Sequence, residues 1–178
     1  MKTVQVKDKH FSLFIKAEDI EKAVTKIANR INEDYHGKKP VFVIILNGAF
    51  VFAASLLKKI RLDCEVTFMK LSSYKGTRTS SKVMEVIGID KEIEGKPVII
   101  VEDIVDTGIT MEYILRRFRD IGIEDVKIAV LLFKPNVFRK DFKIDYLGME
   151  IPDDFIVGYG LDYDGFGRNY PDIYKIKE

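Results

Sequence analysis

Residues 98–110, VIIVEDIVDTGIT, place acidic side chains next to a segment that is typical of a phosphate-binding loop. The four aliphatic residues at its start predict a buried strand, which runs into Glu102, Asp103 and, three residues later, Asp106. The small and hydroxyl-bearing residues 107–110 follow at the expected start of a helix, where backbone N–H groups attract anions. Because carboxylates repel phosphate, the ligand of this segment must have one group that binds to the acids and another that binds to the loop at 107–110.

On both sides of this segment, the hydrophobic pattern changes repeatedly between the period of a helix and that of a strand. Ile20, Val24, Ile27 and Ile31, for example, recur at helical spacing. The predicted helices are 17–34, 50–59 and 109–121, and the predicted strands are 41–46, 64–71, 83–87, 97–102 and 126–133. Short aliphatic strands that alternate with helices indicate an α/β fold, with a mostly parallel sheet flanked by helices.

Length, charge and cysteine content narrow the possible partners. A chain of 178 residues is expected to form a single domain, with a core large enough to need no disulfide or structural metal. The net charge of +1 gives no sign of a surface for nucleic acid or for an anionic membrane, so neither is expected as a partner. The single cysteine, Cys64, cannot form an internal disulfide and is consistent with a cytoplasmic location.

One uncharged stretch, residues 41–57, is long enough to raise the alternative of a membrane span. It follows Pro40 and contains Asn47 and Gly48 near its middle, so a strand, a tight turn and a buried helix explain it better. Residues 1–15 carry charges where a signal peptide would need an apolar run, so no targeting segment is expected.

The expected fold places residues 102–110 where a ligand would bind, since ligands of open α/β sheets bind beyond the carboxyl ends of the strands. The N–H groups of 106–110, two hydroxyls and the helix N-terminus would form a concave anion site. Glu102 and Asp103 are expected to leave the strand end and face the same cleft. A phosphorylated sugar with Mg²⁺ would satisfy both halves, with its phosphate in the loop and its hydroxyls or the metal on the acids. The simpler alternative is a surface loop in which an aspartate caps the helix.

The polar stretch SSYKGTRTSSK, residues 72–82, has two interpretations. It is either a plain hairpin loop or a lid that closes over a bound ligand and excludes water. The residues alone leave both open.

The segment 98–110 resembles the phosphoribosyl-pyrophosphate motif of type I phosphoribosyltransferases, and its acid pair followed by Asp-Thr-Gly resembles the hypoxanthine-guanine branch. The likeness covers nearly the whole chain. ILNGAFVF resembles the pyrophosphate loop of that family, LSSYKG its lid, LLFKP its base-reading lysine strand and EIPDDFIVGYGLDYDGFGR its C-terminal hood. The resemblance implies one domain whose small hood comes from about 1–15 and 135–178, and a homodimer or homotetramer. It also implies transfer of a phosphoribosyl group from phosphoribosyl pyrophosphate to a 6-oxopurine in purine salvage, with Mg²⁺ as cofactor.

The resemblance further implies roles on the sugar-phosphate side of the site. Glu102 and Asp103 would hold the ribose hydroxyls, directly or through Mg²⁺, and Asp162 would be a further metal ligand. The 5-phosphate would be bound by Asp106, Thr107, Gly108, Thr110 and the amide of Ile109. Asp106 would also exchange a proton with ring nitrogen N7 of the purine, as a general acid–base.

On the purine side, the resemblance implies that the ammonium group of Lys134 donates to the 6-oxo group, which adenine lacks. Phe155 would stack on the purine opposite Ile104, and the backbone of Ile156 would read the base edge.

The leaving pyrophosphate would be bound by amides of Leu46, Asn47 and Gly48 and by the planar guanidinium of Arg168. In this family the peptide before the second of these residues is often cis. Ser73 and Tyr74 would close over the reacting centre.

Three positions depart from patterns in this family. Asn47 stands where many relatives carry a basic residue, Ile109 replaces a lysine found in some members, and two glycines precede Arg168. Two alternatives within the family stay open. One is a transferase for another base, such as xanthine. The other is an RNA-binding, nucleotide-sensing regulator, which would need a basic patch and a non-acidic residue in place of Asp106. A scaffolding protein would need none of these acids.

Overall fold

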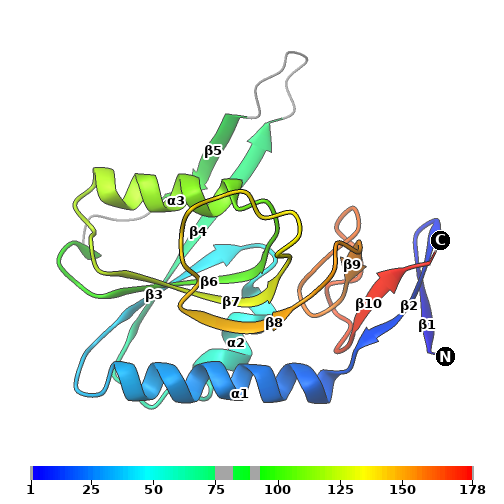
Figure 1. The fold of residues 1–178 in the computed structure, drawn as a ribbon, viewed down its shortest axis with the longest axis horizontal. Coiled ribbons are helices and arrows are strands. Elements are labelled where there is room, and N and C mark those ends of the chain that lie inside the picture. Colours follow the sequence, from blue (N-terminus) through cyan, green and yellow to red (C-terminus); the bar gives the residue numbers. More distant parts are fainter. Residues whose placement is uncertain (1, 75–81, 89–92, 178) are drawn as a thin grey trace.

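The structure, a computed structural model, describes residues 2–74, 82–88 and 93–177 and contains two β-sheets (Figure 1). The larger sheet has six strands in the order β5-β4-β3-β6-β7-β8. Its strands are β3 (Val41–Leu46), β4 (Glu65–Tyr74), β5 (Lys82–Ile87), β6 (Val98–Val105), β7 (Val126–Phe133) and β8 (Tyr146–Glu150). All neighbours pair in parallel except β4 and β5, which are antiparallel. The mostly parallel α/β fold predicted from the sequence is confirmed.

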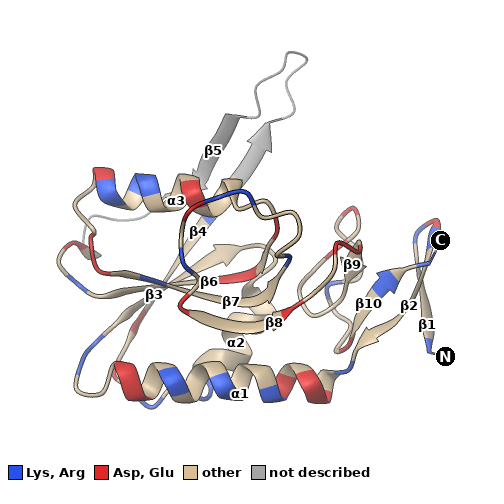
Figure 2. Cartoon of the chain, in the orientation of Figure 1, with Lys and Arg blue, Asp and Glu red and all other residues tan. Residues whose placement is uncertain are grey.

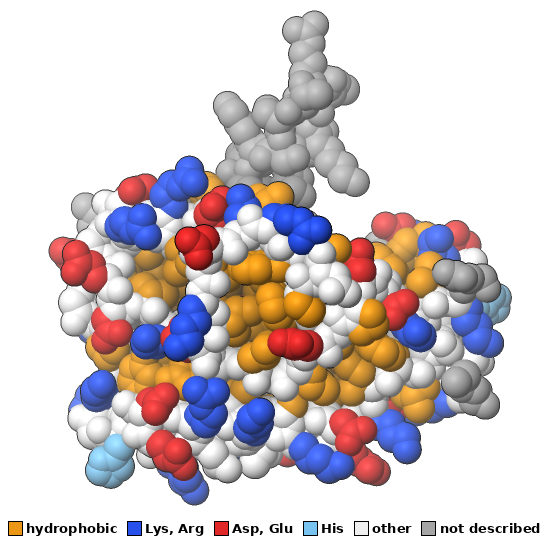
Figure 3. Space-filling model, viewed as in Figure 1, with side chains coloured by type: hydrophobic (Ala, Val, Ile, Leu, Met, Phe, Trp, Pro, Cys, Tyr) orange, Lys and Arg blue, Asp and Glu red, His pale blue; other side chains and the backbone are white. Residues whose placement is uncertain are grey.

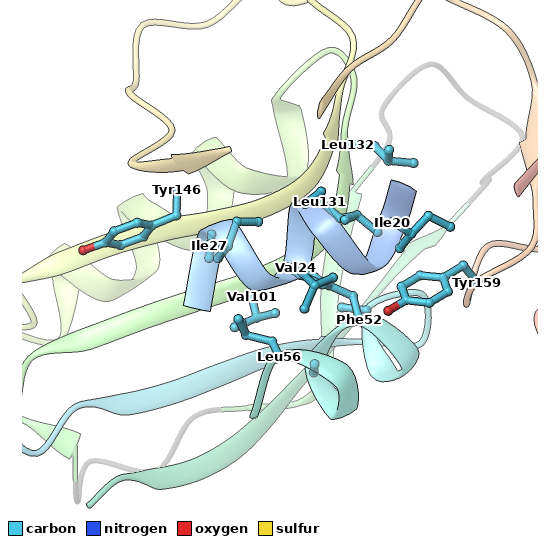
Figure 4. Close-up of a cluster of buried hydrophobic side chains, with 14 of the residues drawn as sticks. Ile20, Val24, Ile27, Phe52, Leu56, Val101, Leu131, Leu132, Tyr146 and Tyr159 are labelled. Carbon is cyan, nitrogen blue, oxygen red and sulfur yellow. The ribbon is translucent and has the colours of Figure 1, made fainter. Parts of the chain in front are cut away.

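Helices cover both faces of this larger sheet. Helices α1 (Ala17–Asp34) and α2 (Phe50–Leu57) pack on one face and α3 (Ile109–Asp120) on the other (Figure 1). The aliphatic strands supply both cores, because successive side chains point to opposite faces. In β3, Phe42 and Ile44 meet α1 and α2, while Val43 packs with the helix α3. Figure 4 shows the first of these cores, with residues from α1 and α2 pointing toward side chains of β6 and β7.

A second sheet, here called the hood sheet, joins the two ends of the chain. Its strands are β1 (Thr3–Val6), β2 (Lys9–Ile15), β9 (Ile156–Val157) and β10 (Ile173–Ile176), in the order β1-β2-β10-β9 and antiparallel throughout. Figure 1 shows it beside the end of the larger sheet at which β8 stops. Residues 135–178 were expected to contribute to the hood, but strand β8, which lies within this range, belongs to the larger sheet. The prediction of a single domain stays a prediction.

Five elements have other limits than the sequence predicted, and three of them differ by two residues or more at one end. Strand β6 continues to Val105, so Glu102 and Asp103 lie within it, because its pairing with β7 runs on as far as Phe133. Strand β4 continues to Tyr74 because it pairs with β5. Helix α2 ends at Leu57, two residues before the predicted end.

The predicted lid therefore begins inside β4. Ser73 and Tyr74 belong to that strand, and their side chains lie outside the described part of the structure. The centre of the lid, 75–81, is not described either.

The uncharged stretch 41–57 forms β3, a turn and α2, as the sequence predicted. Among the described residues, no helix combines the length and the apolar character needed to cross a membrane.

Candidate active site

A cavity of about 320 Å³ opens where β3 and β6 end and α3 begins. Two segments supply most of its walls: the end of β3 and the run from β6 into α3. The lining residues are Ile45, Leu46, Leu71, Glu102, Asp103, Ile104, Val105, Asp106, Gly108, Thr110 and Met111. The structure thus brings both predicted acids and the predicted anion-binding loop to one cavity.

Glu102 and Asp103 form a buried acid pair in this cavity, with exposed fractions of 8% and 7%. Burial, together with the charge of Asp103 and a hydrogen bond to it, raises the pKa of Glu102 well above its ordinary value. Burial also raises the pKa of Asp103, although the hydrogen bond from Glu102, backbone N–H groups and the positive charge of Arg168 act in the opposite direction. The pair therefore favours a shared proton, or a cation in its place.

The turn after β3 packs directly against this pair. The Leu46–Asn47 peptide bond is cis, as the resemblance to the family implied. A Cβ atom on Gly48 would lie 1.9 Å from the Oδ2 atom of Asp103, so only glycine allows this approach. A Cβ atom on Gly160 would in turn lie 2.1 Å from the carbonyl oxygen of Gly48. Two glycines therefore bring the turn, the acid pair and the C-terminal segment into contact.

The loop between β6 and α3 is shaped by Gly108. This residue has a φ of 83° and forms the N-cap of α3, and a Cβ atom there would lie 2.7 Å from the ring of Phe138. Arg139 supports the loop by donating its backbone N–H to the carbonyl of Thr107 at 3.3 Å. The Thr107 amide donates to Asp106 Oδ1, so a phosphate would have to replace that carboxylate as its acceptor.

Arg168 lies in the C-terminal segment 150–168, and its positive charge acts on the acid pair by opposing the rise in the pKa of Asp103 that burial causes. Its guanidinium donates to the carbonyl oxygen of Gly160 at 2.6 Å and lies 2.7 Å from Asp162 Oδ1. Asp162 also accepts a hydrogen bond from the Gly165 amide at 2.6 Å. Both predicted residues are thus side by side, and the glycines that precede Arg168 do not leave its side chain without partners.

The residues predicted to bind the purine are more dispersed. Lys134 forms an ion pair with Asp153, with 3.1 Å between Nζ and Oδ1, and its backbone N–H donates to Val105. Ile104 lines the cavity. Phe155 is 46% exposed and packs beside other rings of the hood, while the Ile156 side chain is buried in β9.

A family model, the phosphoribosyl transferase domain, matches residues 15–164, which include the whole cavity. The chain belongs to this family. The described site of this phosphoribosyltransferase comprises the loop at the start of α3, the buried acid pair and the segment that carries Asp162 and Arg168.

Alignments with similar proteins extend over almost all of this phosphoribosyltransferase. It is 38% identical to the hypoxanthine-guanine phosphoribosyltransferase of Aquifex aeolicus, over 98% of this chain and 99% of that protein. Among solved structures, a hypoxanthine-guanine phosphoribosyltransferase from Bacillus anthracis superposes with a TM-score of 0.86 at 36% identity, covering 94% and 97% of the two chains. The hypoxanthine phosphoribosyltransferase of Trypanosoma cruzi, in complex with its product IMP, gives 0.85 at 31% identity over 98% and 97%.

Sequence reasoning missed several residues of this phosphoribosyltransferase site. Gly160 and Asp153 were not singled out, although both lie in the segment that resembles the hood, and the GYG pattern was a usable signal for the former. Phe138, which backs the loop at Gly108, and Leu71, which lines the cavity, gave no local signal because the fold alone brings them there.

Proposed function

We propose that this enzyme transfers the 5-phosphoribosyl group from phosphoribosyl pyrophosphate to hypoxanthine, and to guanine as a second substrate. The products are IMP or GMP and pyrophosphate, and the reaction belongs to purine salvage. The observation that carries the proposal is the single cavity that unites the buried acid pair with the loop at the start of α3. The names of the relatives support the choice of a 6-oxopurine.

The arrangement suits a transition state in which positive charge develops on the ribose. Carboxylates at Glu102 and Asp103 hold the ribose hydroxyls and favour that charge, while the loop from Thr107 to Thr110 binds the 5-phosphate. Asp106 lines the same cavity and is exposed, so it can exchange a proton with ring nitrogen N7. The ribosyl group is thus fixed at its phosphate and its hydroxyls while the base attacks.

Mg²⁺ fits the residues present. The acid pair offers the oxygen donors that Mg²⁺ prefers, and a divalent cation would favour the charged form that burial opposes. Among the described residues no group of three or more His, Cys, Asp or Glu could hold a metal, so the substrate's oxygens are expected to complete the shell. When bound, Mg²⁺ neutralises the charge of the leaving pyrophosphate. The predicted third ligand, Asp162, does not form such a group with the acid pair in the described structure, and it would have to exchange its ion pair with Arg168 to join this shell.

The purine and pyrophosphate contacts are assigned to the turn after β3 and to the segments that lead into the hood. Lys134 donates to the 6-oxo group, Phe155 stacks on the base opposite Ile104, and the Ile156 backbone reads its edge. The pyrophosphate is bound by Leu46, Asn47, Gly48 and Arg168, and Ser73 and Tyr74 of the proposed lid close over it.

A second copy of this chain is the proposed partner, in a homodimer or homotetramer. Val66 and Phe68 are 42% and 46% exposed on β4, and Phe50 at the start of α2 is also 46% exposed. Large exposed apolar side chains favour association. Light scattering should give a multiple of 20.5 kDa for the parent and a smaller mass for Phe68→Glu. A monomeric parent would contradict the proposal.

We also propose a cytoplasmic location, in which the free thiol of Cys64 persists.

A panel of bases tests the reaction. Hypoxanthine, guanine, xanthine, adenine and uracil are each incubated with phosphoribosyl pyrophosphate, with and without Mg²⁺, and nucleotide formation is measured. We expect IMP and GMP in the presence of Mg²⁺ only. Product from xanthine alone would favour the transferase for that base, and product from adenine or uracil alone would refute the proposal.

The regulatory alternative is tested with the same preparation. An RNA-binding regulator would need a basic patch, but on the face shown in Figure 3 acidic and basic side chains are interspersed. Figure 2 shows the same mixture along α1. RNA binding without nucleotide formation would support the regulator.

A further inference from the structure

Phe155 needs an external support if it is to stack on a base. Its side chain is 46% exposed, and β9, which begins directly after it, has only two residues. An exposed ring that directly precedes so short a strand has several rotamers available, and each purine that binds would have to select one of them. Neighbouring side chains must therefore restrict the ring if the stacking surface is to be formed in advance.

Two rings in the hood contact Phe155. Tyr163 lies with its centroid 5.9 Å away at an interplanar angle of 86°, which is an edge-to-face contact. Phe11, which is fully buried in β2, lies 6.3 Å away at 42°. Phe11 and Tyr163 are themselves 6.4 Å apart. The three rings form one cluster in which Phe155 is the most exposed member.

Tyr163 is itself fixed by the turn between β1 and β2. Its hydroxyl group donates to Asp8 Oδ1 at 3.1 Å, and the ammonium groups of Lys7 and Lys9 lie 5.9 Å and 5.6 Å from its ring centroid. Backbone hydrogen bonds in both directions with Phe166, of 2.9 Å and 3.1 Å, close a small hairpin around Tyr163. The ring is thus held at its edge, its face and its backbone.

The same hairpin adjoins the residues assigned to the metal and to pyrophosphate. Tyr163 directly follows Asp162, which is ion-paired to Arg168, and Lys7 also pairs with Asp164 at 2.9 Å. A displacement of this hairpin would therefore change the positions of both the Phe155 ring and Arg168.

We infer that Tyr163, anchored by the Lys7–Asp8–Lys9 turn, is a positioning residue that fixes the ring of Phe155 for stacking on the purine. The inference rests on the proposed function, since it assigns the ring to a 6-oxopurine. It gives the N-terminal hairpin a part in base affinity, although no residue of that hairpin lines the cavity.

Steady-state kinetics of Tyr163→Leu test the part in binding. Losing an edge-to-face partner should raise the KM for hypoxanthine about three- to tenfold. The backbone hydrogen bonds that close the hairpin are retained in this variant, so Arg168 should stay in place and kcat and the KM for phosphoribosyl pyrophosphate should be nearly unchanged. Tyr163→Phe keeps the ring and should restore the parent KM to within about twofold. Tyr170→Leu is the matched control, because Tyr170 is a hood ring that contacts Tyr174, with no ring contact to Phe155 in the described chain. If Tyr170→Leu raised this KM equally, or if Tyr163→Leu left it unchanged, the inference would be overturned.

A fluorine resonance tests the positioning without catalysis. With 4-fluorophenylalanine at position 155, the ¹⁹F signal should shift or broaden in Tyr163→Leu and stay near the parent position in Tyr170→Leu. If the parent transferred nothing to hypoxanthine, the proposed function would fail, yet a shifted signal would still support the positioning of this ring. An unshifted signal in Tyr163→Leu overturns the inference whatever the kinetics.

Discussion

The cavity at the start of α3 and the hood are built in opposite ways. The acids and the anion-binding loop come from the continuous segment 102–110, held by the buried pairing of β6 with β7. The hood unites both chain ends, and many of its cross-links are partly exposed ion pairs, such as Lys2 with Asp172 and Lys175 with Asp154. Exposed ion pairs stabilise little, so the hood should open at a lower free-energy cost than the cavity. The proposed chemistry therefore lies in the rigid region, and the proposed stacking of Phe155 on the base lies in the adjustable one.

The largest effect is expected from Asp106→Asn, in the rigid region. The amide keeps the shape of the side chain but cannot exchange a proton, so kcat should fall by about 10²–10⁴-fold. Binding of phosphoribosyl pyrophosphate, measured by isothermal titration with Mg²⁺, should survive because the loop amides and the acid pair are retained. Normal binding with turnover within about threefold of the parent would remove Asp106 from the chemistry.

Gly48→Ala tests whether the cavity depends on the contact of its turn with the acid pair. The new Cβ would lie 1.9 Å from Asp103 Oδ2 and 2.6 Å from its Cγ, so the carboxylate or the turn must move. A displacement near 1 Å at a reacting centre reduces kcat/KM by about 10²-fold. Steady-state rates, with circular dichroism as the check on folding, decide the matter. A folded variant with parent activity would show that this approach is not needed.

A smaller effect, on stability, is expected from Asp172→Ala, because Asp172 ties the hood to α1. Its Oδ1 accepts the Ala17 amide at 2.9 Å, whereas Lys16, at the N-cap of α1, makes no side-chain cap bond. Loss of this cap should lower the free energy of unfolding by about 1–2 kcal/mol in urea titrations at pH 7. Asp172→Asn, which retains an acceptor oxygen, should lose less. Equal midpoints for all three proteins would contradict the capping role.

Asp172 also predicts a pH dependence. The hydrogen bond from Lys2, followed by that from the Ala17 amide, lowers the pKa of Asp172 below its ordinary value of 3.8. The unfolded chain therefore takes up this proton more readily than the folded one. Its stabilisation is complete above about pH 3.8 and is lost as the pH falls through the folded-state pKa. The Asp172→Ala protein should lack this part of the acid sensitivity.

The smallest effect is expected from Glu102→Gln, and its sign is opposite. Burial raises the pKa of Glu102 well above 4.5, so the unfolded chain releases the proton more readily than the folded one. The stability that this group contributes is present below pH 4.5 and declines as the pH rises toward the folded-state pKa. Without ligand, the variant should therefore lose less thermal stability than the parent between pH 4.5 and pH 8. Parallel curves for the two proteins would refute this.

Sequence reasoning succeeded where the signal is local. The strands 41–46 and 126–133 and the start and end of α1 were predicted from runs and periods of hydrophobic residues. The errors lie where pairing partners decide an element's length. Strand β6 was predicted to end at Glu102, with both acids leaving the strand end toward the cleft, but its pairing with β7 continues to Val105. Ser73 and Tyr74 were read as loop because the stretch 72–82 is polar, but they pair with Val83 and Lys82 of β5.

The sequence by itself determined the α/β layering, the order of the elements between residues 17 and 133 and the grouping of acidic and hydroxyl side chains in 102–110, because these depend on residues that are neighbours along the chain. Only the tertiary structure decided that Gly48 packs against Asp103 and that Lys134 pairs with Asp153. It also decided that Tyr163, whose hydroxyl group donates to Asp8, contacts Phe155. Most of these contacts join residues far apart in the chain. Their geometry depends on how the two sheets and the helices pack together, and no local pattern of side chains specifies contacts between residues so far apart in the sequence.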